Sequence, residues 1–477
     1  MSDQERAPIA DRYDAFPPPG PQPRPFMIPG HKGSTDLVGP VVASDISLWG
    51  HLVPMKEAAH VLADAEALAA DLWGADWARF SVGGSSHGNQ ALALAVGQPG
   101  DEVVVTRAVH RSLLLGFVLA GLHPVWVAPP VDPVTGLPGR LSAQAVRRVL
   151  ADHAGARAVF AVEPGYAGTR SDVAALADAA HGAGVPLLVD QAWSAHFGFH
   201  PALPPHALAA GADAMVTSAH KSLPAFTQAA LVVARTERLD PDRLQRGFDA
   251  THTTSPAGPI LASIDAARRL LATDGERLLD RALTAVAEAR RRLGEVRGLA
   301  VLDGPADEVD PLRLVVGLAG TGADGFVVED DLLAHGIGLE MADRDTLVAT
   351  VTLADTAATV EPLVDAIVAA VERRRDEPRA VLAAAWLGTD LPEVALPPRA
   401  AFFAPHETVP AAAAVGRVAA ELVAPYPPGI PAIVPGEVLT ADVLAALRGA
   451  AAAGVRVAYA ADPTMATVQV VAAPPSS

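Results

Sequence analysis

The chain has 477 residues, half of them hydrophobic but only 5% aromatic, and it contains no cysteine. This length allows two or three domains with a large core, and the absence of cysteine excludes a disulfide framework and thiolate metal sites. The formal charge of −18 argues against a nucleic-acid partner, because a phosphate backbone is bound by clustered Lys and Arg.

Proline dominates the start of the chain, with eight prolines in the first 30 residues and three in a row at 17–19. Proline lacks a backbone N–H and has a fixed φ angle. We therefore expect residues 1–30 to form an extended arm rather than a helix or an interior strand.

Between residues 80 and 233, short β-branched runs alternate with stretches rich in alanine and leucine. This alternation is typical of an α/β fold in which helices cover both faces of a mostly parallel sheet. The expected strands are residues 101–106, 125–128, 156–162, 185–189 and 214–217. In such sheets, ligands bind at the carboxyl ends of the strands.

The second half of the chain suggests further units. A hinge is expected at 272–275, followed by one long amphipathic helix at 276–297 and a smaller α/β unit with strands at 313–316 and 346–352. The last hundred residues are rich in Ala and Pro and look like an appended lobe. We therefore expect an arm at 1–30, a large domain at 31–272, a small α/β domain at 273–375 and a C-terminal lobe at 376–477.

The segment at 217–223, which reads TSAHKSL, places Lys221 directly after an apolar strand. Partial desolvation there helps the amine to lose its proton, so that it can attack an aldehyde. Asp190 ends another apolar strand, and a carboxylate in that place can hold a protonated pyridine nitrogen. Lys221 alone could be a surface loop residue, but together with Asp190 it forms the minimum set of residues for binding pyridoxal 5'-phosphate.

The segment GGSSHGN at 83–89 precedes a helical stretch at 90–96. Gly84 would let the backbone approach an anion, while serine hydroxyls and the helix N-terminus would donate hydrogen bonds to a phosphate. Serine is also a common helix cap, so this loop is weak evidence when taken alone. It gains weight because the hydroxyls before Lys221 could reach the same phosphate.

Three more positions suit the cofactor and its substrate. His110 follows the strand at 101–106 and could lay its ring on the pyridine face, or it could be a partly exposed loop histidine. Ala192 is small enough to lie against the opposite face of the ring. Trp193 and His196 follow Asp190 closely, and we assign them to the substrate side, although Trp193 could equally be part of the wall.

These segments, in this order, resemble the ornithine/lysine/arginine decarboxylase family of fold-type I pyridoxal-phosphate enzymes. The segment FMIPGHKG at 26–33 is similar to the family's PGHK motif, and the resemblance extends to PYPPGIP at 425–431 and PGE at 435–437. SAHK at 218–221 and THTTSP at 251–256 look like family signatures, and EPGYAG at 163–168 is similar to the PTYYG turn. The resemblance therefore covers nearly the whole chain.

Carried over by position, the resemblance implies that Lys221 forms the Schiff base, that Asp190 pairs with the pyridine nitrogen and that His110 stacks on the ring. It assigns the phosphate to the hydroxyls of Ser85, Ser86 and Ser218. It also implies a homodimer, or a multiple of one, in which each active site is completed by the partner subunit.

The chain departs from the family pattern in several places. It has no room for an N-terminal wing domain and therefore looks like the short form. Gly83 stands where Asn is usual, Arg111 stands where lysine commonly follows the stacking histidine, and the segment at 45–52 matches poorly. QAW at 191–193 replaces the short form's Glu-Ala-His. These departures bear on the substrate more than on the cofactor.

We predict a decarboxylase of a basic amino acid, namely lysine, ornithine or arginine. Glu437 is the candidate for binding the distal cationic group, although it could be an exposed turn residue, and Glu340 is a weaker candidate. His220 or the freed Lys221 could return a proton to the α-carbon. An aminotransferase or lyase on the same scaffold, or a catalytically silent homologue, remains an alternative.

Other classes of site find little support. The histidines show no metal-ligand spacing, so no metal is expected. No apolar run reaches the roughly 18 residues of a membrane span, and the first residues lack a secretory pattern. We therefore expect a cytoplasmic protein with no membrane partner.

Overall fold

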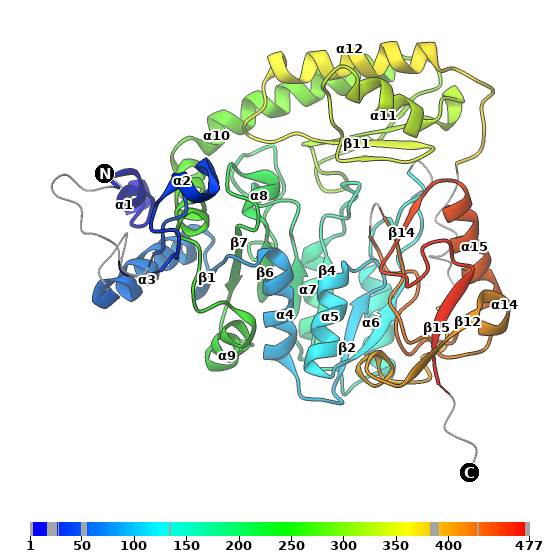
Figure 1. The fold of residues 1–477 in the computed structure, drawn as a ribbon, viewed down its shortest axis with the longest axis horizontal. Helices are drawn as coiled ribbons and strands as arrows, with labels where there is room; N and C mark the ends of the chain where they lie inside the picture. Colours follow the sequence, from blue (N-terminus) through cyan, green and yellow to red (C-terminus); the bar gives the residue numbers. More distant parts are fainter. Residues whose placement is uncertain are drawn as a thin grey trace. The chain divides into compact units, whose positions relative to one another are not determined.

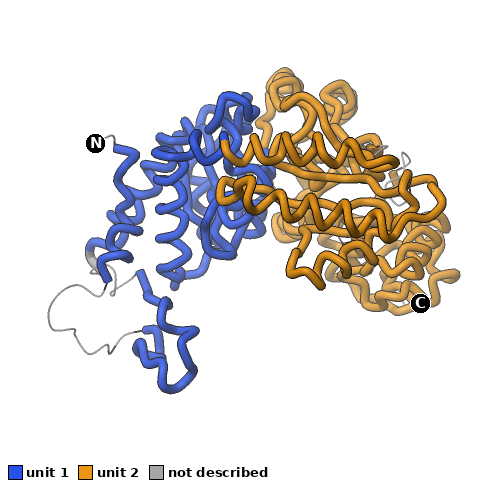
Figure 2. Tube along the Cα trace, turned by 90° about the horizontal axis from the view of Figure 1, so that it is seen from above, with its two compact units in different colours: residues 1–95, 189–280 blue, residues 96–188, 281–477 orange. Residues whose placement is uncertain are grey.

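In a computed structural model of the chain, the structure describes residues 3–16, 26, 28–48, 55–132, 135–381, 391–426 and 429–472. Part of the expected arm, and parts of the motifs at 26–33, 45–52 and 425–431, lie outside these residues. The chain divides into two compact units (Figure 2). Unit 1 comprises residues 1–95 and 189–280, and unit 2 comprises residues 96–188 and 281–477.

The central sheet has seven strands in the order β1-β7-β6-β5-β4-β2-β3 (Figure 1). They are β1 (Trp77–Ser81), β2 (Glu102–Thr106), β3 (His123–Val127), β4 (Val159–Val162), β5 (Leu187–Asp190), β6 (Ala214–Thr217) and β7 (Ala230–Ala234). Strand β2 is parallel to β3 and β4, whereas β7 is antiparallel to β1 and β6. The five expected strands and the α/β class with a mostly parallel sheet are therefore confirmed.

Strands β5, β6 and β7 are buried along their whole length. Their residues are almost entirely Ala, Val, Leu and Met, as expected of strands that are covered on both faces. The exceptions are the last residues of β5 and β6, which are Asp190 and Thr217. Polar groups are thus concentrated where these two strands end.

The described helices of the first half are η1 (Asp3–Glu5), α1 (Ala10–Asp14), α2 (Thr35–Val38), η2 (Pro40–Val42), α3 (Met55–Leu72), α4 (Gly84–Val96), α5 (Arg111–Ala120), α6 (Ala143–Asp152), α7 (Val173–Gly182), α8 (Ala219–Ser222), α9 (Pro241–Thr251) and α10 (Gly258–Gly294). Among them, α5, α6, α7 and α9 begin at a residue whose side chain accepts a hydrogen bond from the first turn. Asp240, for example, accepts the N–H groups of Asp242 and Arg243 and so caps α9.

The expectation of an extended N-terminal arm is wrong for residues 10–14, which form the short helix α1. Asp265 of α10 accepts the N–H of Ile9 at 2.8 Å, and Arg268 donates to the carbonyl of Gln4 at 3.0 Å. These buried groups hold the segment against α10, so it does not depend on its own helix propensity. Proline is frequent only after Phe16, and sequence composition averaged over 30 residues hid this difference.

The expected break at 272–275 is also wrong, because α10 runs through these residues as one helix of 37 residues. Thr273 donates to the carbonyl of Arg269 at 3.1 Å, and Asp274 pairs with Arg277 at 2.9 Å. Both side chains therefore bond within the helix instead of starting a turn. Gly275 in the helix interior costs about 1 kcal/mol, which the buried Leu271 and Leu279 can offset.

Unit 2 also contains a four-stranded antiparallel sheet in the order β10-β11-β9-β8 and two ribbons, β12-β15 and β13-β14. The strands are β8 (Ala300–Val301), β9 (Arg313–Gly317), β10 (Met341–Ala342), β11 (Thr346–Thr350), β12 (His406–Pro410), β13 (Ala424–Tyr426), β14 (Arg456–Ala458) and β15 (Thr467–Val471). The helices are η3 (Ala319–Thr321), α11 (Gly325–Leu333), α12 (Ala357–Arg373), α13 (Pro398–Phe402), α14 (Ala411–Ala414) and α15 (Ala441–Ala452). Within the described part of the chain, no helix combines the length and apolar character needed to cross a bilayer.

Candidate active site

The segments that follow β5 and β6 are tied together in unit 1. The N–H of Gln191 donates to the carbonyl of Val216 at 2.8 Å, and the hydroxyl of Thr217 donates to the carbonyl of Gln191 at 3.0 Å. Farther along, the N–H of Ala195 donates to the hydroxyl of Ser222 at 3.0 Å. These bonds join the segment that begins with Asp190 to the segment that carries Lys221.

Lys221 lies in the short helix α8 and is partly buried. Its Nζ atom lies 3.7 Å from the centroid of the Trp193 ring. A lysine ammonium at this distance is attracted by the face of the indole ring. Trp193 is thus in direct contact with the predicted Schiff-base amine, and it can shield that amine from water.

Asp190 is buried and held by two hydrogen bonds. Asn89 of α4 donates its side-chain N–H to Oδ2 at 2.7 Å, and the backbone N–H of Ala192 donates to Oδ1 at 3.1 Å. Two donors on one carboxylate fix its orientation. This is what a partner for a protonated ring nitrogen requires.

Sequence reasoning missed Asn89 because it placed the helix start at residue 90, whereas α4 begins at Gly84. In a helix that includes 84–89, Asn89 lies four residues after Ser85 and so shares its face. The same helix therefore presents the predicted phosphate serine and the amide that holds Asp190. A helix prediction that extended to Gly84 could have found this residue.

The hydroxyls of Ser85 and Ser218 lie 2.6 Å apart, and both side chains are buried. Ser86 is exposed on the first turn of α4, and Gly84 has a φ of +69°, a conformation that favours glycine. The donor set consists of hydroxyl groups and the N-terminal N–H groups of a 13-residue helix. Its chemistry fits a phosphate group.

His220 is partly buried, and its Nδ1 donates to the carbonyl of Ala229 at 2.9 Å. Burial lowers the pKa of His220, and the charge of Lys221 lowers it further, against the effect of the Ala229 carbonyl. The ring is therefore neutral at neutral pH. Since Nδ1 carries the proton, Nε2 can accept one.

His196 is 2% exposed and packs edge to face on Phe197, with the ring centroids 5.1 Å apart. Ala192 is partly exposed, and its N–H bonds to Asp190 as described above. His110 belongs to unit 2, where it caps α5 and its ring is exposed. The Nδ1 atom of His110 lies 2.8 Å from the hydroxyl of Ser112. The cofactor and substrate roles of these three residues stay predictions.

Glu437 is 2% exposed rather than a surface turn residue. Its Oε2 pairs with Arg107 at 3.2 Å and accepts the N–H of Val434 at 2.9 Å. Burial raises the pKa of Glu437, and Arg107 opposes this shift. Arg107 also lies 5.0 Å from the centroid of the Trp126 ring. The sequence offered one signal for Arg107, its place directly after β2.

The weaker candidate, Glu340, is exposed and accepts a hydrogen bond from the Tyr166 hydroxyl at 2.9 Å. Burial raises the pKa of Tyr166, and the neighbouring Glu340 charge raises it further. Tyr166 therefore remains protonated and acts as a donor. This pair belongs to unit 2, as do Arg107 and Glu437.

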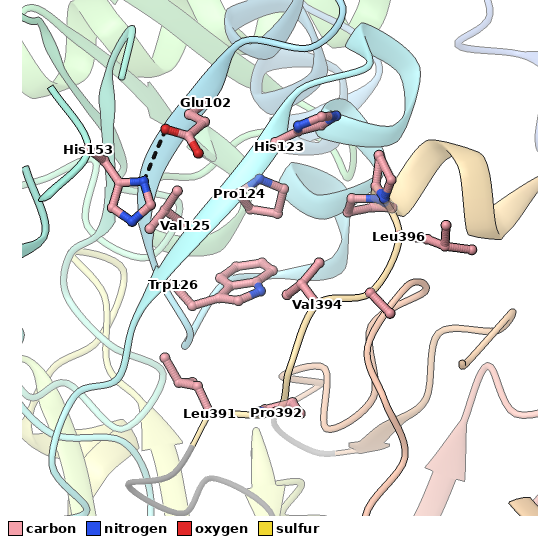
Figure 3. Close-up of a pocket in the computed structure, with 13 residues that line it drawn as sticks. Glu102, His123, Pro124, Val125, Trp126, His153, Leu391, Pro392, Val394 and Leu396 are labelled. Atoms are coloured by element: carbon pink, nitrogen blue, oxygen red, sulfur yellow. Dashed lines mark hydrogen bonds and ion pairs between the residues drawn. The ribbon is translucent and has the colours of Figure 1, made fainter. Parts of the chain in front are cut away.

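Unit 2 also has a cavity of about 540 Å³ beside β3 (Figure 3). The Glu102–His153 pair lines it, with 3.0 Å between Oε2 and Nδ1, and so do Trp126, Val394 and Leu396. None of the residues predicted to contact the cofactor or substrate lines this cavity. The described residues contain no cluster of three or more metal-ligating side chains.

Comparison with known proteins decides the family. The sequence model of "Orn/Lys/Arg decarboxylase, major domain" matches residues 22–305, and that of "Orn/Lys/Arg decarboxylase, C-terminal domain" matches residues 382–453. The chain belongs to this family. The resemblance drawn from the sequence motifs is thereby confirmed.

Individual members of the family match over nearly the full length. An arginine decarboxylase from Halalkalibacterium halodurans is 32% identical over 99% of both chains. The solved structure of lysine decarboxylase A from Pseudomonas aeruginosa has a TM-score of 0.81 at 21% identity, covering 98% of this chain and 81% of that chain. A structure described as SPT with PLP has a TM-score of 0.53 at 17% identity, covering 65% of this chain and 77% of that chain.

This protein is therefore a pyridoxal 5'-phosphate-dependent amino-acid decarboxylase of fold type I. It acts on a basic amino acid. The residues that follow β1, β5 and β6 fit its cofactor, because within one unit they supply a hydroxyl-lined helix N-terminus, a fixed carboxylate and an amine.

Proposed function

We propose that the enzyme decarboxylates arginine, releasing carbon dioxide and the corresponding amine. The observation that carries this proposal is the contact between Lys221 and Trp193. Lys221 follows β6, and β6 lies next to β5, the strand that ends at Asp190. The choice of arginine is supported by the names of full-length relatives, which include arginine decarboxylases from Bacillus subtilis and Halalkalibacterium halodurans. Lysine and ornithine are the competing substrates.

When bound, pyridoxal phosphate supplies an electron sink for the charge left on the α-carbon as carbon dioxide departs. Asp190 would hold a proton at the ring nitrogen, and Asn89 and the Ala192 N–H orient its carboxylate. The hydroxyls of Ser85, Ser86 and Ser218 would bind the phosphate, and His110 would stack on the ring.

Lys221 would supply the amine that holds the cofactor, and its ammonium group would supply the proton that takes the place of the departing carboxylate on the α-carbon. The Trp193 ring holds the ammonium form in place by covering one side of it. His220 is less suited to donate this proton, because its lowered pKa leaves it neutral. Its Nε2 can instead accept a proton during the cycle.

The distal guanidinium of the substrate would bind Glu437. Among the described residues, the Oε1 atom of Glu437 has no hydrogen-bond partner, whereas Oε2 is taken by Arg107 and Val434. One N–H of a guanidinium could donate to this unsatisfied oxygen, giving a charge-assisted hydrogen bond. His196 and Trp193 would complete the substrate side.

The proposal includes the homodimer, the cytoplasmic location and a role in polyamine metabolism. Of the expected division, the proposal keeps the lobe at 376–477. It does not keep the extended arm at 1–30 or the boundary at 272/273, because residues 10–14 form a helix and α10 runs through Gly258–Gly294. Analytical ultracentrifugation would test the homodimer.

Release of carbon dioxide from arginine, lysine and ornithine, assayed side by side, tests the proposed reaction. We expect arginine to give the highest kcat/KM and Lys221→Ala to give no release from any of the three. Formation of a keto acid without carbon dioxide would favour an aminotransferase instead. Cofactor binding without turnover of any substrate would indicate a catalytically silent homologue.

A further inference from the structure

His87 lies in the first turn of α4, next to the serines assigned to the phosphate, and it takes no part in the proposed reaction. It is 5% exposed and belongs to unit 1, as do Ser85 and Ser218. Its Nε2 lies 2.9 Å from the carbonyl of Phe248, and its Nδ1 lies 2.8 Å from the hydroxyl of Ser81. The ring also packs edge to face on Phe248, with 4.5 Å between the centroids. The imidazole is therefore held at both nitrogens.

The two contacts determine which nitrogen of His87 carries the proton. A carbonyl oxygen only accepts hydrogen bonds, so Nε2 is the protonated nitrogen and donates to Phe248. Burial lowers the pKa of His87, and the carbonyl of Phe248 opposes this shift, so the ring is neutral at neutral pH. The Nδ1 atom therefore has a lone pair that accepts the hydroxyl proton of Ser81.

Ser81 links the imidazole to the turn that begins α4. It is buried at the end of β1, and its Oγ accepts the N–H of Gly83 at 3.2 Å. The same hydroxyl lies 3.2 Å from the carbonyl of Gly84, a longer contact than the one to His87. Because His87 takes the hydroxyl proton, a lone pair of Ser81 Oγ is directed to the Gly83 N–H.

The two glycines are also fixed by packing and by a second hydrogen bond. A Cβ atom on Gly83 would lie 2.9 Å from the Cβ atom of His87, which is closer than such atoms approach. The turn therefore lies directly against the histidine side chain. On the next residue, the N–H of Gly84 donates to the carbonyl of Gln228 at 2.8 Å.

We propose that His87 is a positioning residue for the phosphate of the cofactor: by holding Ser81, it fixes the turn that directs Ser85 and the first N–H groups of α4. Ser85 follows the turn directly, and its hydroxyl lies 2.6 Å from that of Ser218. This inference rests on the proposed assignment of the phosphate to these serines. It goes beyond that assignment, because His87 acts through Ser81 and not on the cofactor itself.

Pyridoxal 5'-phosphate and pyridoxal, which lacks the phosphate, distinguish loss of phosphate positioning from general damage to the site. The affinity of the full-length protein, freed of cofactor, is measured for both compounds by titration of the visible absorbance. His87→Leu removes both hydrogen bonds of the ring. We expect it to lower the preference for the phosphorylated compound by about three- to tenfold, as for the loss of one hydrogen bond, and to leave the affinity for pyridoxal unchanged.

Two further variants follow the same contact. Ser81→Ala, a smaller change in the core, should lower the preference to the same extent, and the double variant should be no worse than either single variant. His87→Asn should retain most of the preference, because its amide oxygen can accept the Ser81 proton in place of Nδ1. His206→Leu is the matched control and should leave the preference unchanged. His206 is also a buried histidine of unit 1, stacked on Phe199 with 6.4 Å between the centroids.

Equal losses of affinity for both compounds in His87→Leu would overturn the inference, because the residue would then be merely structural. An unchanged preference in Ser81→Ala would overturn it as well. Ser85→Ala tests the phosphate site separately, and an unchanged preference there would refute the proposed site and, with it, the inference. If Ser85→Ala lowers the preference but His87→Leu does not, the inference fails alone.

Discussion

Substitution of Asn89 tests directly whether its hydrogen bond to Asp190 supports the pairing of Asp190 with the cofactor's ring nitrogen. The Asn89 amide donates to Asp190 at 2.7 Å, and this is one of two hydrogen bonds that hold the buried carboxylate. Asn89→Leu keeps the volume but removes the donor, and the apolar side chain leaves little room for a replacing water. A hydrogen bond to a charged group contributes about 1.5 to 3 kcal/mol. We therefore expect kcat to fall by about tenfold to a hundredfold.

The assay measures carbon dioxide release together with the visible absorbance of the bound cofactor, which should persist. Gln90→Leu is the matched control, because Gln90 is the next residue of α4 and is only partly buried. In an Asp190→Asn background, Asn89→Leu should have little additional effect, since the two residues act through one carboxylate. A kcat within twofold of wild type for Asn89→Leu, with the cofactor bound, would refute this reasoning.

Three further predictions concern the cofactor and the pH dependence of stability. Lys221→Ala should abolish covalent attachment of the cofactor, measured by mass spectrometry after borohydride reduction; an adduct of unchanged mass would exclude this lysine. Asp190→Asn should retain the cofactor but reduce turnover by orders of magnitude, and near-normal turnover would contradict its role. Burial raises the pKa of Glu66 to about 7 from an ordinary value of 4.5, with Arg79 opposing. The folded state therefore binds more protons than the unfolded state between these pH values, so the stability due to Glu66 should fall by about 3 kcal/mol as pH rises through this range. Urea unfolding at several pH values should show a shallower slope for Glu66→Gln, and an unchanged slope would count against the raised pKa.

The sequence predicted local features well where one short segment determines them. Runs of Val, Leu and Ala predicted the five strands, because a strand covered on both faces needs apolar residues throughout. The motifs that follow these strands predicted the family. Local signals gave a wrong prediction of a hinge at 272–275. A Thr-Asp-Gly sequence can end a helix, but here the Thr273 side chain forms a hydrogen bond within α10.

Contacts between residues that are distant along the chain were found only in the structure. Asn89 and Asp190 are separated by 101 residues, and Arg107 and Glu437 by 330 residues. No spacing rule connects such residues, since it is the folded backbone that brings them within hydrogen-bonding distance. The sequence by itself therefore determined the α/β class, the family and the chemical groups available for catalysis. Tertiary structure alone decided which amide holds Asp190 and which cation meets Glu437, because both depend on packing between distant segments.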